Sequence, residues 1–244
     1  MNELWKSVAQ NVTFVAEFAA IIVVMFLVAL LFEKMAMKKR GVTEPVFTPR
    51  KMAMIGMFSA LAMILHIFDF ALPFAPPFYK LDFSELPILI GSFAFGPAAG
   101  VMMEFLKILL KLCIKGTSTA FVGDLANFMI GCSFILPASI LYAFGKKKIS
   151  AIVGCVVGTL VLTVFGTAFN AVYLLPAFST LFGMPMESIL QAGSAVNPLA
   201  TGDSIVNFVI VCVAPMNLIK GTTASVVTML VYKKLSPILK TGHR

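Results

Sequence analysis

Apolar runs recur along the whole chain, and several of them are long enough to cross a lipid bilayer. A transmembrane helix needs about 20 largely apolar residues. The clear candidates are residues 12–33, 51–70, 122–145, 150–176 and 205–232. Only 12% of the 244 residues are charged, against about 25% in soluble domains. Barrel strands would alternate polar and apolar residues, whereas these runs are apolar on all sides. We therefore expect an all-α membrane protein.

Residues 85–116 form a further apolar segment, which would be about 45 Å long as one helix and so too long for one ordinary crossing. Gly96-Pro97 interrupts it, because proline removes a backbone donor and disfavours helix just before it. If the segment is a hairpin, most of the 19 basic residues face one side, as the positive-inside rule requires. These residues are Lys34, Lys38, Lys39, Arg40, Arg50, Lys51, Lys146, Lys147, Lys148, Lys233, Lys234, Lys240 and Arg244. The charge distribution therefore predicts a hairpin.

The predicted crossings divide the chain into three parts. Residues 1–45 are an additional N-terminal transmembrane helix with a basic cytoplasmic linker, 46–236 a six-helix membrane domain, and 237–244 a basic cytoplasmic tail. The first helix lacks the basic n-region and the cleavage site of a signal peptide, so we expect it to stay as an anchor. The N-terminus is then outside and the C-terminus is cytoplasmic. Two long outer connections, 71–84 and 177–204, are suited to covering a site.

Lys220 is the most unusual ionisable residue of the apolar runs, because a lysine near the membrane centre costs at least about 2.5 kcal/mol. Asn217 precedes it by three residues, so both project from one helix face. If Pro215 opens the final helix, Asn217 lies in its first turn near the outer surface. Lys220 either contacts a ligand, or it snorkels or pairs with a carboxylate such as Asp124 or Asp203.

Three other polar residues lie toward the same outer side. Asn170 is expected at a depth similar to that of Asn217, where it either contacts a ligand or forms an interhelical hydrogen bond. Asp124 and Asn127 lie at the outer end of another helix, and the dipole of that helix favours a capping role for Asp124. The match in depth with Asn217 and Lys220 favours Asn170 as a candidate ligand residue.

Two further clusters are less specific. Glu104, Lys107 and Lys111 follow helical spacing, which predicts local ion pairs facing the bundle. Aromatic residues around Phe78 and Tyr79 are typical either of an interfacial belt or of a lid over a flat ligand.

Small residues form close-packing faces on two helices. Gly56 and Ala60 lie on one helix, and Gly154 and Gly158 on another. Such faces serve internal packing or the docking of a partner helix.

The sequence lacks the motifs of an autonomous catalyst or motor. It has no P-loop, no HExxH, no GxSxG and no histidine cluster. The four cysteines are far apart, so neither a metal site nor a disulfide is inferred. The net charge of +8 is that of a topology signal, not of a nucleic-acid surface. We expect no enzyme activity and no cofactor, and a separate protein that supplies the energy.

Four segments together carry a family resemblance. They are YKLDFSELPILIGSFAFGPAAGVMMEFLKILLKL, GTSTAFVGDLANFMIG, FNAVYLLP and PMNLIKG. With them, about residues 50–235 resemble the riboflavin-specific substrate-binding (S) component of energy-coupling factor (ECF) transporters. The resemblance implies a six-helix core that binds the vitamin from outside and associates with a transmembrane coupling subunit and two ATPases. Gly56 and Ala60 would form the docking face.

The resemblance also implies the binding residues. The flavin-binding groups correspond to Asn170, Asn217 and Lys220, and the loop contacts to Phe78, Tyr79, Leu81 and Asp82; Asn127 completes our candidate set. The chemistry agrees, because an asparagine amide can donate to and accept from the uracil-like edge of an isoalloxazine ring. Three features depart from the family: the additional first helix, Gly56 where alanine is more usual, and a long connection at 177–204.

Three alternatives remain open at this stage. The chain could be an S component for another vitamin, or an autonomous gradient-driven carrier that uses Lys220 or Asp124 for coupling. It could also be a structural membrane protein without a ligand.

Overall fold

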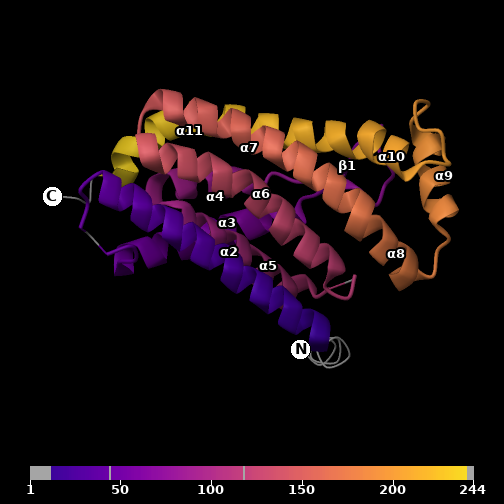
Figure 1. The fold of residues 1–244 in the computed structure, drawn as a ribbon, viewed down its shortest axis with the longest axis horizontal. Coiled ribbons are helices and arrows are strands. Elements are labelled where there is room, and N and C mark those ends of the chain that lie inside the picture. Colours follow the sequence, from indigo (N-terminus) through magenta and orange to yellow (C-terminus); the bar gives the residue numbers. More distant parts are fainter. Residues whose placement is uncertain (1–11, 44, 118, 241–244) are drawn as a thin grey trace.

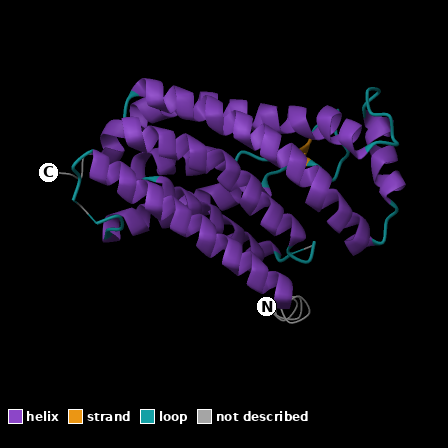
Figure 2. Cartoon of the chain, in the orientation of Figure 1, coloured by secondary structure: helices purple, strands orange, loops and turns teal. Residues whose placement is uncertain are grey.

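The fold is a bundle of long helices with loops and short helices gathered at one end, as Figures 1 and 2 show. The computed structural model describes residues 12–240, except 44 and 118. The long helices and the helical hairpin are α2 (Val12–Lys39), α3 (Pro49–Ile67), α4 (Glu85–Phe95), α5 (Pro97–Lys115), α6 (Val122–Gly145), α7 (Lys148–Phe169) and α11 (Ala214–Lys240). The N-terminal and C-terminal ends of the described chain lie at opposite ends of the bundle (Figure 1).

Five helical segments of the described residues are long and apolar enough to cross a membrane. They are Phe14–Lys39, Pro49–Ile67, Val122–Gly145, Lys148–Phe182 and Ile205–Val231. They correspond to the five apolar runs, which confirms the expected all-α, multi-pass membrane architecture. The predicted tail at 237–244 is helical as far as Lys240, and residues 241–244 lie outside the described residues.

The segment at 85–116 folds back on itself as a hairpin. Lys107 Nζ lies 3.4 Å from Glu85 Oε1, whereas 22 residues of straight helix would separate them by about 33 Å. Gly96 makes the turn with a φ of 108°, which favours glycine, and Pro97 starts α5 in the first turn, where its missing N–H costs nothing. The hairpin prediction is therefore confirmed.

The two arms of the hairpin differ in length. Helix α5 has 19 residues, but α4 has only 11, so α4 is about 16 Å long and spans about half of a hydrocarbon core. The preceding chain, through β1 (Phe70–Ala71) and β2 (Lys80–Leu81), takes the place of its outer half. This connection is buried at Ala75, Tyr79, Leu81 and Asp82, whereas β1 is exposed. Non-helical backbone at membrane depth is tolerated where it is buried in protein. Part of the expected outer cover thus folds into the bundle.

The additional helix α2 packs against α5 and α6 and is fixed to the hairpin turn. Glu33 Oε2 accepts the N–H of Ala98 at 2.9 Å, at the start of α5, where the helix dipole favours a negative charge. A side chain at position 96 would collide with this carboxylate. Helix α2 is therefore locked to the core by a buried polar contact.

The connection at 177–204 is mostly helical rather than an irregular loop. It consists of the end of α8 (Leu175–Phe182), then α9 (Met186–Val196), and then an irregular stretch that leads to α10 (Ile205–Phe208). Helix α9 and the β1–β2 hairpin lie at the same end of the bundle (Figure 1).

Two of the long helices contain π-helical segments, η1 (Asn170–Leu174) and η2 (Val209–Val213). Each is followed by a proline, Pro176 or Pro215, whose missing N–H cannot continue the ordinary ladder. Because α10, η2 and α11 are continuous, Pro215 lies inside the helix. The prediction that Pro215 opens the final helix is therefore wrong. Such segments are frequent at functional sites.

Candidate functional site

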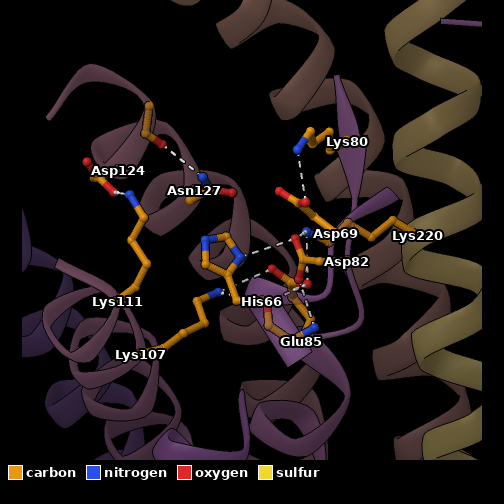
Figure 3. Close-up of polar contacts among 12 residues, drawn as sticks. His66, Asp69, Lys80, Asp82, Glu85, Lys107, Lys111, Asp124, Asn127 and Lys220 are labelled. Atoms are coloured by element: carbon orange, nitrogen blue, oxygen red, sulfur yellow. Dashed lines mark hydrogen bonds and ion pairs between the residues drawn. The ribbon is translucent and has the colours of Figure 1, made fainter. Parts of the chain in front are cut away.

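The candidate site lies where the inward-folded connection meets α7 and α11. Tyr79, Leu81 and Asp82 are buried there, each less than a tenth exposed. Figure 3 shows Asp82 between His66 and Lys220, with Glu85 beside it. Chain segments more than 130 residues apart in sequence thus supply neighbouring polar groups, as the Lys220–Asp82 pair shows.

The two asparagines predicted to bind a ligand meet at Gly166 on α7. Asn170 Nδ2 donates to the carbonyl oxygen of Gly166 at 2.7 Å. A methyl group at Gly166 would lie 2.7 Å from Asn217 Nδ2, so the Asn217 amide packs directly on that glycine. Only a residue without a side chain lets both amides approach the same turn.

Asn217 Nδ2 is buried and has no hydrogen-bond partner among the residues that the structure describes. Leaving a buried donor unpaired costs about 1–3 kcal/mol. A buried polar group in this condition needs an explanation, and a missing ligand is one of them.

Tyr79 connects the loop to Asn170. Its hydroxyl donates to Asn170 Oδ1 at 2.7 Å, and both residues are buried. The ring of Tyr79 also packs near that of Phe208, at 6.1 Å between centroids. In the chain alone, Tyr79 therefore satisfies the oxygen of the Asn170 amide.

Asp82 makes the corresponding contact with Lys220. Lys220 Nζ lies 3.1 Å from Asp82 Oδ2 and 2.9 Å from Glu85 Oε2. Asp82 also accepts the N–H of Ser84 at 2.8 Å, and His66 Nδ1 lies 3.3 Å from its carboxylate. Burial alone would raise the pKa of Asp82, but the Lys220 ammonium, His66 and the Lys107 ammonium together outweigh it and hold that pKa well below its usual range. Lys220 is therefore neutralised by carboxylates, but neither of them is Asp124 or Asp203.

We refer to Tyr79, Asp82, Asn170, Asn217 and Lys220 together as the polar ring, since they lie around the meeting point of the loop, η1 and α11. Tyr79 and Asp82 come from one loop, Asn170 from η1, and Asn217 and Lys220 from one face of α11. The ring contains a hydroxyl, a carboxylate, an ammonium and two amides. Such a set can bind an uncharged molecule that carries both donors and acceptors.

Three predicted residues stand outside the polar ring. Leu81 is buried in the apolar cluster beside it, and the ring of Phe78 lies 5.0 Å from that of Tyr79 while its side chain is partly exposed. Asn127 donates to the carbonyl oxygen of Gly123 in its own helix at 3.0 Å. Asn127 forms no hydrogen bond with the polar ring in the part of the chain that the structure describes.

The hairpin carries a second buried charge cluster, formed by Glu85, Glu104 and Lys107. Lys107 Nζ lies 2.6 Å from Glu104 Oε2, which confirms the local pair. Lys111 instead pairs with Asp124 at 2.7 Å. The other oxygen of Asp124 accepts the Thr117 hydroxyl at 2.8 Å. The expected capping role of Asp124 is therefore corrected to an ion pair.

Sequence reasoning missed three groups at the site: Glu85, His66 and Gly166. An ionisable residue beside an apolar run is itself a signal, and Glu85 and His66 both meet that description. Gly166 carried no comparable signal, since its role depends on how α7 and α11 pack.

The comparisons with known proteins agree on one family. Residues 50–232 match the family model described as the substrate-specific component of ECF transporters. The chain is 32% identical over 191 residues to the riboflavin transporter RibU of Staphylococcus aureus, covering 78% of this chain and 93% of that protein. It is 31% identical over 190 residues to the riboflavin transporter FmnP of Bacillus subtilis, covering 77% and 93%.

A solved structure described as the S component of a bacterial ECF transporter is also similar. The TM-score is 0.60 at 34% identity, and the match covers 78% of this chain and 98% of that chain. Helix α2 ends before residue 50, where the match to the family model begins.

Proposed function

Because the chain belongs to the family of substrate-specific (S) components of ECF transporters, we propose that it binds riboflavin at the polar ring from outside the cell. Riboflavin is then taken up across the cytoplasmic membrane by the assembled transporter. The relatives' names support this ligand, since both are riboflavin transporters.

The observation that carries the assignment is the unpaired amide of Asn217 within the polar ring. The isoalloxazine ring presents an N–H flanked by carbonyl oxygens. A carbonyl oxygen of this ring system would accept from Asn217 Nδ2, and Lys220 has further donors for a carbonyl or for ribityl hydroxyls. Phe78 and Tyr79 would lie against the flat face of the ligand. Binding thus supplies the hydrogen bond that Asn217 lacks.

The loop contacts suggest how the site stays closed without a ligand. Tyr79 satisfies Asn170, and Asp82 satisfies Lys220. A ligand that takes over these hydrogen bonds would separate the loop from Asn170 and Lys220. The same loop would then close over the bound ligand. The proposed order is therefore loop opening, ligand entry and closure by the same segment.

The source of energy would be a transmembrane coupling subunit with two ATPases, because this chain has no P-loop. The docking face would be the side of α3 that faces away from the bundle. Gly56 is exposed, and no atom of the described residues lies within 4 Å of a methyl group built on it; Met57 beside it is also exposed. Ala60 lies one turn further on and is partly buried.

The orientation follows from charge. The basic turns at 34–51 and 146–148 belong on the cytoplasmic side by the positive-inside rule, which puts the loop at 68–84 outside and the C-terminus inside.

The test is a riboflavin titration of the purified chain. Asn217→Ala combined with Lys220→Ala should weaken binding by orders of magnitude, because both replaced groups donate to the ligand. Asn217→Ala alone should weaken binding while leaving the unfolding midpoint unchanged or higher, since it removes an unpaired donor. Gln191→Ala with Lys115→Ala, both at exposed positions, is the matched control.

Unchanged affinity in the double variant would remove the site assignment. A colourless wild-type preparation that binds no added flavin would remove riboflavin as the ligand. Uptake by the chain alone in liposomes under an imposed ion gradient would favour an autonomous carrier instead.

A further inference from the structure

A groove with a volume of about 990 Å³ runs along the seam between α7 and α11, away from the polar ring. Its walls are apolar, and the residues that form them include Ile152, Val156 and Leu160 of α7 and Leu218, Val226 and Leu230 of α11. All six side chains are at least 40% exposed. The fold leaves this apolar surface open.

The groove reaches into the bundle at one end. The two helices touch where the hydroxyls of Thr159 and Ser225 lie 3.2 Å apart. Closer to the α6–α7 turn, the lining includes Tyr142 of α6 and Ala151 of α7, both buried. The groove is therefore a crevice bounded by three helices rather than a shallow track between two.

The dimensions suit one acyl chain. On α7 the lining runs from Lys148 to Leu160, 12 residues apart, which corresponds to about 18 Å of helix. One leaflet is about 15 Å of the roughly 30 Å hydrocarbon core. The groove thus extends through a single leaflet and ends near its surface.

The end of the groove at the N-terminus of α7 is positively charged. Lys148 lines the groove and Lys147 beside it is exposed. No carboxylate pairs with either lysine in the part of the chain that the structure describes. The sequence has no acidic residue between Asp124 and Glu187 and none after Asp203. The N-terminus of α7 adds a positive partial charge at the same place. This end of the groove is therefore suited to an anionic group of another molecule.

We propose that this groove, the α7–α11 groove, binds an anionic phospholipid. One acyl chain lies along Val156 and Leu160, and the phosphate contacts Lys147 and Lys148. Basic pockets between transmembrane helices recognise lipid head groups in this way. The site is separate from the docking face at Gly56, because α3 packs on α4 and α5, whereas α7 packs on α6 and α11.

The experiment measures lipid retained by the purified full-length chain with native mass spectrometry. The probes are phosphatidylglycerol and phosphatidylcholine with identical acyl chains. We expect one phosphatidylglycerol per chain to bind selectively. Lys147→Gln with Lys148→Gln should weaken its binding about thirtyfold, about fivefold per lysine near the lipid surface, and leave phosphatidylcholine unaffected. Lys34→Gln with Lys38→Gln removes the same charge near the C-terminal end of α2 and should change little.

A second pair of variants tests the groove itself. Val156→Trp fills it and should displace the acyl chain, whereas Val164→Trp adds the same ring to an exposed position of α7 outside the lining. Equal retention of the two lipids by the wild type would overturn the proposal, as would equal effects of the two tryptophans. Loss of the coupling subunit from Val156→Trp, with phosphatidylglycerol retained, would identify the groove as a protein interface instead.

Discussion

Two buried lysines of this chain, Lys107 and Lys220, occupy different kinds of charge cluster. Lys107 is fully buried and pairs with Glu104 and Glu85, both on its own helical hairpin. Lys220 pairs with Asp82, on a loop, and with the shared Glu85. One cluster is closed by elements that the hairpin turn already holds together, and the other depends on a loop staying folded inward.

The difference separates a structural role from a binding role. Lys107 has no reason to change partners, since its carboxylates are one helical turn away or across the hairpin. Lys220 and Asn170 contact the loop that we propose opens for the ligand, and Asn217 Nδ2 has no partner among the described residues. A buried charge by itself therefore does not identify the binding site. The proposed site is distinguished by polar groups whose partners a ligand can replace.

The largest effect is expected for Lys107→Met, which leaves Glu104 buried without its cation. Removing one partner of a buried ion pair costs about 3–5 kcal/mol. The thermal unfolding midpoint in detergent should fall strongly, whereas Lys115→Met, at the exposed end of the same helix, should not change it.

Lys220→Met sharpens the same comparison. In this variant Glu85 keeps its ion pair with Lys107, and Asp82 keeps its hydrogen bond from the Ser84 N–H. Compared with Lys107→Met, the loss of stability should therefore be smaller and the loss of riboflavin affinity larger. If Lys107→Met left the midpoint unchanged and abolished flavin binding, the assignment of the two lysines would be reversed.

The sequence predicted the crossings well because their signal is local. Hydropathy identified five spans, and Gly96-Pro97 together with the basic residues identified the hairpin. The two arms of the hairpin also lie where the sequence placed them, on either side of Gly96-Pro97. The inward fold of the connection before α4 was not predictable, because it depends on contacts with distant helices. The partners of Lys220 were missed for a related reason: Asp82 is 138 residues away, and only the packing of the loop against α11 brings them together. Pro215 was misread because a proline inside a π-containing helix has the same local sequence as one at a helix start.

A middle-sized effect is expected at Gly166, on binding as well as on stability. Gly166→Ala would press a methyl group against Asn217 Nδ2, and overpacking of this kind costs about 1–3 kcal/mol. Because the displaced amide is a proposed ligand group, riboflavin affinity should fall about tenfold or more. Gly56→Ala is the control, since a methyl group there meets no atom within 4 Å and the isolated chain should bind as before. Equal affinities for the two variants would mean that the Asn217 amide does not contact the ligand.

The smallest effect is expected at Phe78, the most exposed aromatic candidate of the loop. Its side chain is 45% exposed and packs on Tyr79, so Phe78→Ala should leave the unfolding midpoint nearly unchanged. If the ring lies against the flat face of riboflavin, its loss removes about 0.5–1.5 kcal/mol, which is about a two- to tenfold weaker affinity. Phe68→Ala, at an exposed position before the β1–β2 hairpin, removes an equal ring and should not alter binding. Isothermal titration of both variants distinguishes a lid that touches the ligand from a loop that only encloses it, because only the first makes affinity depend on Phe78.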